Sequence, residues 1–256
     1  MATPLTANAF LSALRAEGLT VVEVGDWRNH NRNHVGPWGP VHGVMIHHTV
    51  TSGSTATVNL CRDGRPDLPG PLCHGVITKD GRVHLVGYGR ANHAGPGDPD
   101  VLQAVIDEGP LPPANEATED GNARFYGFEC ENLGDGEDPW PAVQLEAVER
   151  AAAAVCRAHG WGAASVIGHL EWKPQKIDPR GFTMADMRAR IAGHLGLRHA
   201  EVNGVILSDD EAARRQWDEA ARSLPEVRAL RDEVRHLTTK IDDLRSLVEQ
   251  ALTTRR

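Results

Sequence analysis

The spacing of hydrophobic residues predicts one helix and several strands in the first hundred residues. Phe10, Leu11 and Leu14 fall on one side of a helix over residues 7–17. The Asp80-Gly81 pair separates two apolar runs and is typical of a β-hairpin turn. The predicted strands cover residues 19–24, 41–47, 73–77 and 83–86.

Helical periodicity is stronger after residue 140. Pro141 opens a helix that Gly160 ends, with apolar residues at helical spacing between them. Strands are predicted at 125–131 and 165–167, and a further helix at 183–195. Strands and helices therefore alternate irregularly. This pattern predicts an α/β fold with a mixed central β-sheet flanked by helices.

The pattern changes after residue 196, where two helix starts of the capping-box type follow. In the second helix, apolar residues alternate at spacings of three and four over about four heptads. β-branched residues at the a positions and Leu at d favour a parallel coiled-coil dimer, and hence a homo-oligomer. The alternative is one amphipathic helix packed on the domain. We expect a globular domain at 1–195, a linker with a short helix at 196–222, and a coiled-coil helix at 223–256.

Composition narrows the classes of partner and compartment. The net charge of -8 disfavours a nucleic-acid or anionic-membrane partner, and no run of about 20 apolar residues could span a membrane. The first 18 residues lack the basic start and apolar core of a signal peptide, so we expect synthesis in the cytoplasm. The four cysteines form no C-x-x-C pair and are expected to be reduced.

Three side chains carry the strongest chemical signal. His47 ends a buried apolar run, His169 follows a second such run, and Asp178 comes nine residues later. Two imidazoles and one carboxylate form a three-ligand set. Catalytic zinc is typically held by three protein ligands and one water. The pattern indicates a hydrolase that uses a metal-activated water.

Six short motifs then identify a resemblance. In their order and spacing they resemble the type 2 N-acetylmuramoyl-L-alanine amidases, zinc enzymes related to peptidoglycan recognition proteins. The resemblance covers roughly residues 40–195 and implies the corresponding fold and peptidoglycan as substrate. The motifs are Ile46-His47-His48-Thr49, Cys73-His74-Gly75-Val76-Ile77-Thr78-Lys79-Asp80-Gly81, Asn92-His93-Ala94-Gly95, Tyr126-Gly127-Phe128-Glu129, Gly168-His169 and Lys176-Ile177-Asp178-Pro179.

The resemblance implies a role for each matching position. His47, rather than its neighbour His48, is expected to bind Zn2+ together with His169 and Asp178. Glu129 corresponds to the catalytic Glu and Lys176 to the Lys that stabilises the oxyanion. These roles agree with amide hydrolysis, in which the amine leaves only after protonation. Glu131 is the competitor for the role of Glu129, because alternate side chains of a strand share a face.

Other positions are less decisive. His74 and His93 are expected to contact substrate in the groove or to support the ligands. Some relatives carry a catalytic Tyr at the position of Cys73, so no Tyr role can be transferred here. Cys73 and Cys130 are interpreted as small apolar fillers rather than nucleophiles. Residues 95–123, rich in Pro, Gly and acidic residues, are expected to be a loop that shapes the groove.

The sequence therefore predicts a zinc amidase domain at 1–195 that cuts the bond between N-acetylmuramic acid and L-alanine. The missing signal peptide and the terminal helix suggest a phage endolysin, made in the cytoplasm and acting on the cell wall. One alternative is a peptidoglycan-binding module without catalysis, which retention of the whole residue set argues against. Another is an intracellular amidase that recycles soluble muropeptides.

Overall fold

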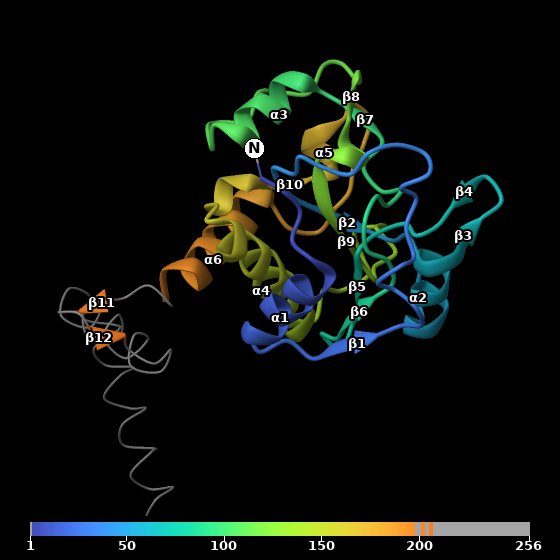
Figure 1. Cartoon of the computed structure of the whole chain (residues 1–256), viewed down its shortest axis with the longest axis horizontal. Coiled ribbons are helices and arrows are strands. Elements are labelled where there is room, and N and C mark those ends of the chain that lie inside the picture. Colours follow the sequence, from blue (N-terminus) through green and yellow to red (C-terminus); the bar gives the residue numbers. More distant parts are fainter. Residues whose placement is uncertain (1, 198–200, 203–204, 207–256) are drawn as a thin grey trace, which may run out of the picture. The chain divides into compact units, whose positions relative to one another are not determined.

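The computed structural model describes residues 2–197, 201–202 and 205–206 of the chain (Figure 1). Met1–Leu195 forms one compact unit, and Gly196–Arg256 forms a second. In the second unit, β11 (Glu201–Val202) pairs antiparallel with β12 (Val205–Ile206). The predicted coiled coil at 223–256 lies outside the described residues. No helix in the described part of the chain is both long and apolar enough to cross a bilayer.

A six-stranded mixed sheet forms the centre of the first unit, in the order β1-β6-β5-β9-β2-β10. All neighbouring strands are parallel except β5 and β6, which form the antiparallel hairpin predicted from Asp80-Gly81. Gly81 turns the chain with φ 78°, a left-handed conformation that favours glycine. The strands are β1 (Val21–Glu23), β2 (Gly43–His48), β5 (Gly75–Ile77), β6 (Val83–Leu85), β9 (Phe125–Cys130) and β10 (Val166–Gly168).

One face of the sheet is covered by the helices that the periodicity predicts. These are α1 (Ala7–Ala16), α4 (Ala142–His159) and α6 (Met184–Leu197). Val44 and Ile46 of β2 pack into the apolar cluster beneath them, together with Phe128 of β9. Gly160 ends α4 in the left-handed conformation expected of a helix C-terminus. The expected α/β fold with a mixed central sheet flanked by helices is thus confirmed.

The other face is covered in two parts, by helices that the periodicity did not predict. Over β2 and β10, Met45 and Ile167 pack beneath α3 (Pro99–Ile106) and α5 (His169–Trp172). Over β5, Val76 packs against Val58 of α2 (Ser54–Asp63). The carboxyl ends of β2 and β9 lie between these two parts.

The segment 95–123 differs from the loop that its composition predicted. It contains α3, which begins with Asp98 as N-cap and Pro99 in the first turn. Val101 and Val105 of α3 are buried against the sheet. Apart from Gly95, the segment does not line the cavity described below. Its bulk therefore covers the sheet, and the expectation that it shapes the groove was wrong.

Four short strands and two 3-10 turns complete the described part of the first unit. Two antiparallel pairs join β3 to β4 and β7 to β8. The bounds are β3 (Gly64–Arg65), β4 (Leu68–Pro69), β7 (Pro96–Gly97), β8 (Glu119–Asp120), η1 (Gly121–Ala123) and η2 (Ala163–Ser165).

Candidate active site

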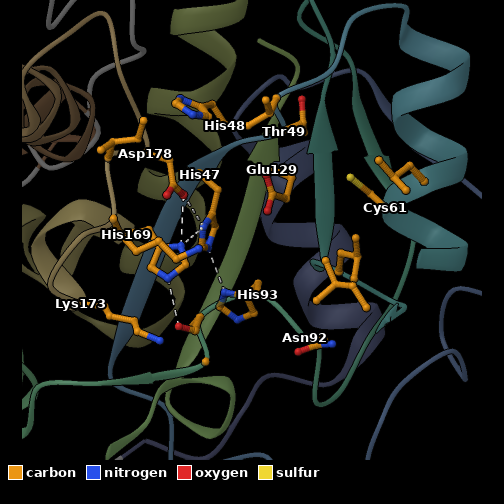
Figure 2. A pocket seen from close by; sticks show the side chains of 18 of the residues that line it. His47, His48, Thr49, Cys61, Asn92, His93, Glu129, His169, Lys173 and Asp178 are labelled. Atoms are coloured by element: carbon orange, nitrogen blue, oxygen red, sulfur yellow. Dashed lines mark hydrogen bonds and ion pairs between the residues drawn. The ribbon is translucent and has the colours of Figure 1, made fainter. Parts of the chain in front are cut away.

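Three side chains meet at the carboxyl edge of the sheet (Figure 2). His47 is the penultimate residue of β2, and His169 begins α5 directly after β10, the parallel neighbour of β2. His47 Nδ1 lies 3.0 Å from His169 Nδ1 and 3.0 Å from Asp178 Oδ2. His169 Nδ1 lies 3.1 Å from the same carboxylate oxygen. One atom from each residue thus surrounds a common point, as metal ligands do.

Hydrogen bonds at the far side of each ring determine which nitrogen carries the proton. His169 Nε2 lies 3.1 Å from the Ala94 carbonyl oxygen, which can only accept. His93 Nε2 donates in the same way to the Phe125 carbonyl (3.1 Å), leaving His93 Nδ1 to accept from His47 Nε2 (3.0 Å). Both His47 and His169 therefore direct Nδ1 lone pairs toward Asp178.

This donor set fits a zinc ion. Two neutral imidazole nitrogens and a carboxylate oxygen are all electron-pair donors, so their convergence is stabilised by a cation between them. Burial lowers the pKa of His47 to about 4 and keeps its ring neutral near pH 7. His47 is thus in its ligating form.

Glu129 lies beside this cluster, on β9 at the position paired with His47. Its side chain faces the cavity next to His47 and Cys61 (Figure 2). The Oε2 atom is buried and has no hydrogen-bond partner. Burial raises the pKa of Glu129 well above its usual value, with smaller contributions from Cys61 and Asp178, while Lys176 opposes the shift. An unpaired carboxyl group with a raised pKa is suited to accept and return a proton near neutral pH.

Glu131, the competitor for this role, is occupied elsewhere. Its two oxygens accept from the Gly53 N–H (2.8 Å), the Ser54 hydroxyl (2.7 Å) and the Lys79 N–H (3.2 Å). Gly53 and Ser54 begin α2, where no local side chain caps the helix. Glu131 therefore supplies the acceptor and the negative charge that stabilise a helix N-terminus.

His48 faces away from the ligand cluster, as alternation along β2 requires. Its Nδ1 accepts from the Arg180 N–H at 3.1 Å. The ring also lies against the backbone at Gly134, where a Cβ atom would come within 2.3 Å of His48 Nε2. His48 thus fixes loops behind the site.

A cavity of ≈ 560 Å³ opens in front of the cluster. Lys176 is exposed at its edge, and His93 lines it with both ring nitrogens engaged. The sequence did not single out Cys61, Arg65 and Lys173, which also line the cavity. Cys61 lies on α2, and Arg65 lies on the adjoining β3. Since neither element was predicted, their residues could not be placed at the site.

His74 does not reach the cavity, in contrast to the expectation of a substrate contact. The residue is 0% exposed. Its Nε2 donates to the Gly89 carbonyl (2.9 Å), and its Nδ1 accepts from the Gly127 N–H (2.9 Å). Burial lowers its pKa to about 4, so the ring is neutral near pH 7. His74 packs behind His93, with ring centroids 5.8 Å apart, and supports it.

The cysteines behave as buried apolar groups. Cys61, Cys73, Cys130 and Cys156 are all free and buried. Burial raises the pKa of the Cys73 thiol well above its usual value, and the same holds for Cys130. A protonated thiol is a poor nucleophile, so neither residue has the environment of a thiol hydrolase.

Comparison with solved structures gives matches of low sequence identity. An endolysin amidase, LysCS from Clostridium intestinale, is 17% identical, with 67% of this chain and 95% of that chain covered and a TM-score of 0.43. The catalytic domain of XlyA is 16% identical, with coverage of 68% and 99% and a TM-score of 0.45. AmiD from E. coli, solved with its substrate, is 16% identical, with coverage of 60% and 58% and a TM-score of 0.44.

Comparison with curated proteins gives no match. The family profile for N-acetylmuramoyl-L-alanine amidases, in contrast, matches residues 37–181, which is more than half of the chain. The matched region begins just before β2 and ends just after Asp178, so it contains all three converging side chains and Glu129. The chain therefore belongs to the N-acetylmuramoyl-L-alanine amidase family of peptidoglycan hydrolases.

Proposed function

We propose that this protein is a zinc-dependent amidase that cleaves the bond between N-acetylmuramic acid and L-alanine, with His47, His169 and Asp178 as the zinc ligands. The observation that carries the proposal is the convergence of three donor atoms within 3.1 Å of one another. The second nitrogens of both rings are held by other groups, which leaves these donors for a cation.

The surrounding residues supply the remaining chemistry. A zinc ion held there would provide Lewis acidity for the water and for the scissile carbonyl. Glu129 accepts the proton of the attacking water through its unpaired Oε2 and returns it to the leaving amine. Lys176, at the cavity edge, stabilises the negative charge that develops on the carbonyl oxygen. His93 orients His47 and forms part of the cavity wall.

The proposed substrate is the intact cell wall, with the protein acting as a lytic endolysin. Val50, Leu68 and Ile177 line the cavity and are exposed at its mouth. A cavity with an exposed rim can admit one unit of a polymer while the rest of the strand stays outside. Soluble muropeptides are the competing substrate.

The test is to incubate the purified protein with sacculi, with and without a chelator, and to follow new L-alanine amino termini by mass spectrometry. Chelator-sensitive release that added zinc restores is the expected result. Release from soluble muropeptides only would replace the endolysin role with a recycling role. Bound zinc without release from either substrate would refute the amidase, and retained release by His169→Ala would refute the zinc mechanism.

For the C-terminal segment we propose a coiled-coil helix at 223–256 that joins two copies of the chain. The support is the heptad pattern of the sequence, in which Leu230 and Leu237 occupy d positions. Light scattering on the full chain is expected to give a dimer mass, and Leu237→Asp is expected to give a monomer. A monomer mass for the unsubstituted chain would reject the proposal.

A further inference from the structure

One short loop touches both histidines of the ligand cluster. His93 Nδ1 lies 3.0 Å from His47 Nε2, and the carbonyl of the next residue, Ala94, lies 3.1 Å from His169 Nε2. The two contacts come from a side chain and a backbone group of consecutive residues. Any shift of this loop would therefore misalign the acceptors of both rings together.

A single side-chain oxygen holds the loop. Asn122 Oδ1 accepts from the N–H groups of His93 (2.9 Å), Ala94 (2.9 Å) and Gly95 (3.2 Å). Successive N–H groups directed at one acceptor form the concave arrangement that also binds anions. The loop also provides an acceptor, because the Gly95 carbonyl accepts a hydrogen bond from the Gly121 N–H at 2.9 Å. The loop is thus fastened through both its donors and its acceptor.

Asn122 reaches residues 93–95 because the segment between them, which carries α3, brings the chain back beside this loop. The segment that carries α3 leaves through β7 and comes back through β8, and these strands pair antiparallel. The residues of η1, which include Asn122, follow directly. Asn122 is only 9% exposed, so its oxygen is shielded from water that would compete for the same N–H groups.

Two glycines of neighbouring segments pack closely against the loop. A Cβ atom at Gly127 would lie 2.5 Å from His93 Nδ1, and one at Gly121 would lie 2.8 Å from the Ala94 Cβ atom. These approaches are closer than van der Waals contact allows, so glycine is required at both positions. The backbone at both glycines therefore packs directly against His93 and Ala94, and the hydrogen bonds to Asn122 hold these two residues in that place.

We infer that Asn122 is a positioning residue for the metal site: by holding residues 93–95 it fixes the Nε2–H tautomers of His47 and His169, so that both present Nδ1 to the ion. The inference rests on the proposed zinc function. Asn122 itself lies behind the loop and does not line the cavity. Residues that orient metal ligands by hydrogen bonds, without binding the metal themselves, typically change metal affinity by about 10–100-fold when they are removed.

The test compares the zinc affinity of the metal-free full-length protein and three variants, by competition with a chromogenic chelator. We expect Asn122→Ala to bind zinc about 10–100-fold more weakly. Asn122→Asp keeps an acceptor oxygen and is expected to bind at least as tightly as the unsubstituted protein. Asn132→Ala is the matched control, because Asn132 is also buried and its Oδ1 holds the Gly134 N–H (2.8 Å), away from both ligand rings.

Each outcome separates the inference from the function on which it rests. No zinc binding by the unsubstituted protein would refute the proposed function. Zinc binding with unchanged affinity in Asn122→Ala, equal weakening in Asn122→Asp, or equal weakening in Asn132→Ala would overturn the inference. Weak binding by Asn122→Asp would show that an acceptor oxygen of the same size and place is not enough, which contradicts the inference.

Two further measurements keep the test valid if Asn122→Ala does not fold. His93→Phe preserves the three bonds to Asn122 but removes the acceptor of His47 Nε2–H, so weaker zinc binding is expected, and unchanged binding would overturn the inference. In 15N spectra of the histidine rings, Asn122→Asp should keep both Nε2–H tautomers. A tautomer change at either ring in that variant would also count against the inference.

Discussion

The carboxyl edge of the sheet has a cavity region and a supporting region, built from nearly adjacent residues of the same strands. His47 and Glu129 belong to the cavity region. The supporting region contains His48, which borders the cavity but turns its ring away from the ligand cluster, and Glu131, which directly follows β9. In the supporting region every described acceptor is matched, since Glu131 has three donors and His48 has one. In the cavity region Glu129 Oε2 has no partner. The carboxylate oxygen without a partner thus lies on the cavity side of this edge, whereas the carboxylate with three donors supports the fold.

The largest expected effect comes from replacing each of the two neighbouring histidines in turn. His47→Ala removes a proposed ligand and should abolish both zinc binding and release of L-alanine termini from sacculi. His48→Ala should retain zinc, because its ring lies on the other face of β2. Metal content by mass spectrometry and activity on sacculi measure both effects. Loss of zinc from His48→Ala alone would reverse the assignment.

The next effect concerns the proton-transfer group. Glu129→Gln keeps the shape of the side chain but cannot accept a proton, so kcat should fall by about 10²–10⁴-fold. Zinc content should be unchanged, because the carboxyl group is not among the three converging donors. Steady-state kinetics on a soluble muropeptide measures this effect. Activity within a few-fold of the unsubstituted enzyme would remove Glu129 from the mechanism.

The same substitution at Glu131, in the supporting region, should affect the stability of the fold rather than the rate of the reaction. Glu131→Gln removes the charge at the start of α2 and replaces one acceptor oxygen with a donor, so at least one partly buried N–H or O–H group loses its partner. The free energy of unfolding should fall by roughly 1–3 kcal/mol. Urea denaturation of the metal-free protein measures it. A kcat lowered as far as in Glu129→Gln, with stability unchanged, would contradict the division between the two regions.

The smallest effect is a pH dependence of stability at Glu129. Because the folded-state pKa of Glu129 is raised, its contribution to stability is full below the unfolded value near 4.5 and is lost as pH rises through the folded value. The Tm of metal-free Glu129→Gln, relative to the unsubstituted protein, should therefore increase from pH 4 to pH 8. Differential scanning calorimetry in the presence of a chelator measures the two Tm values. A difference that is constant with pH would show that Glu129 is not desolvated.

The accuracy of the sequence-based predictions followed the local strength of the patterns. The helix from Pro141 to Gly160 and the hairpin at Asp80-Gly81 were confirmed because their start and stop signals are local. By contrast, α2 was missed because its first turn is capped by Glu131, which is remote in sequence. The helix α3 was missed because the surrounding Pro and Gly residues mask its short apolar stripe.

The donor types and their order can be read from the chain alone, since two histidines after apolar strands and a later carboxylate identify a candidate metal site without coordinates. Only the tertiary structure could separate His47 from His48 by environment, match Glu131 with its three donors, and bury His74 behind His93. It also brought Asn122 back to residues 93–95. The physical reason is that residue type is a property of the chain, whereas burial and hydrogen-bond partnership depend on groups from distant segments that meet only in the fold.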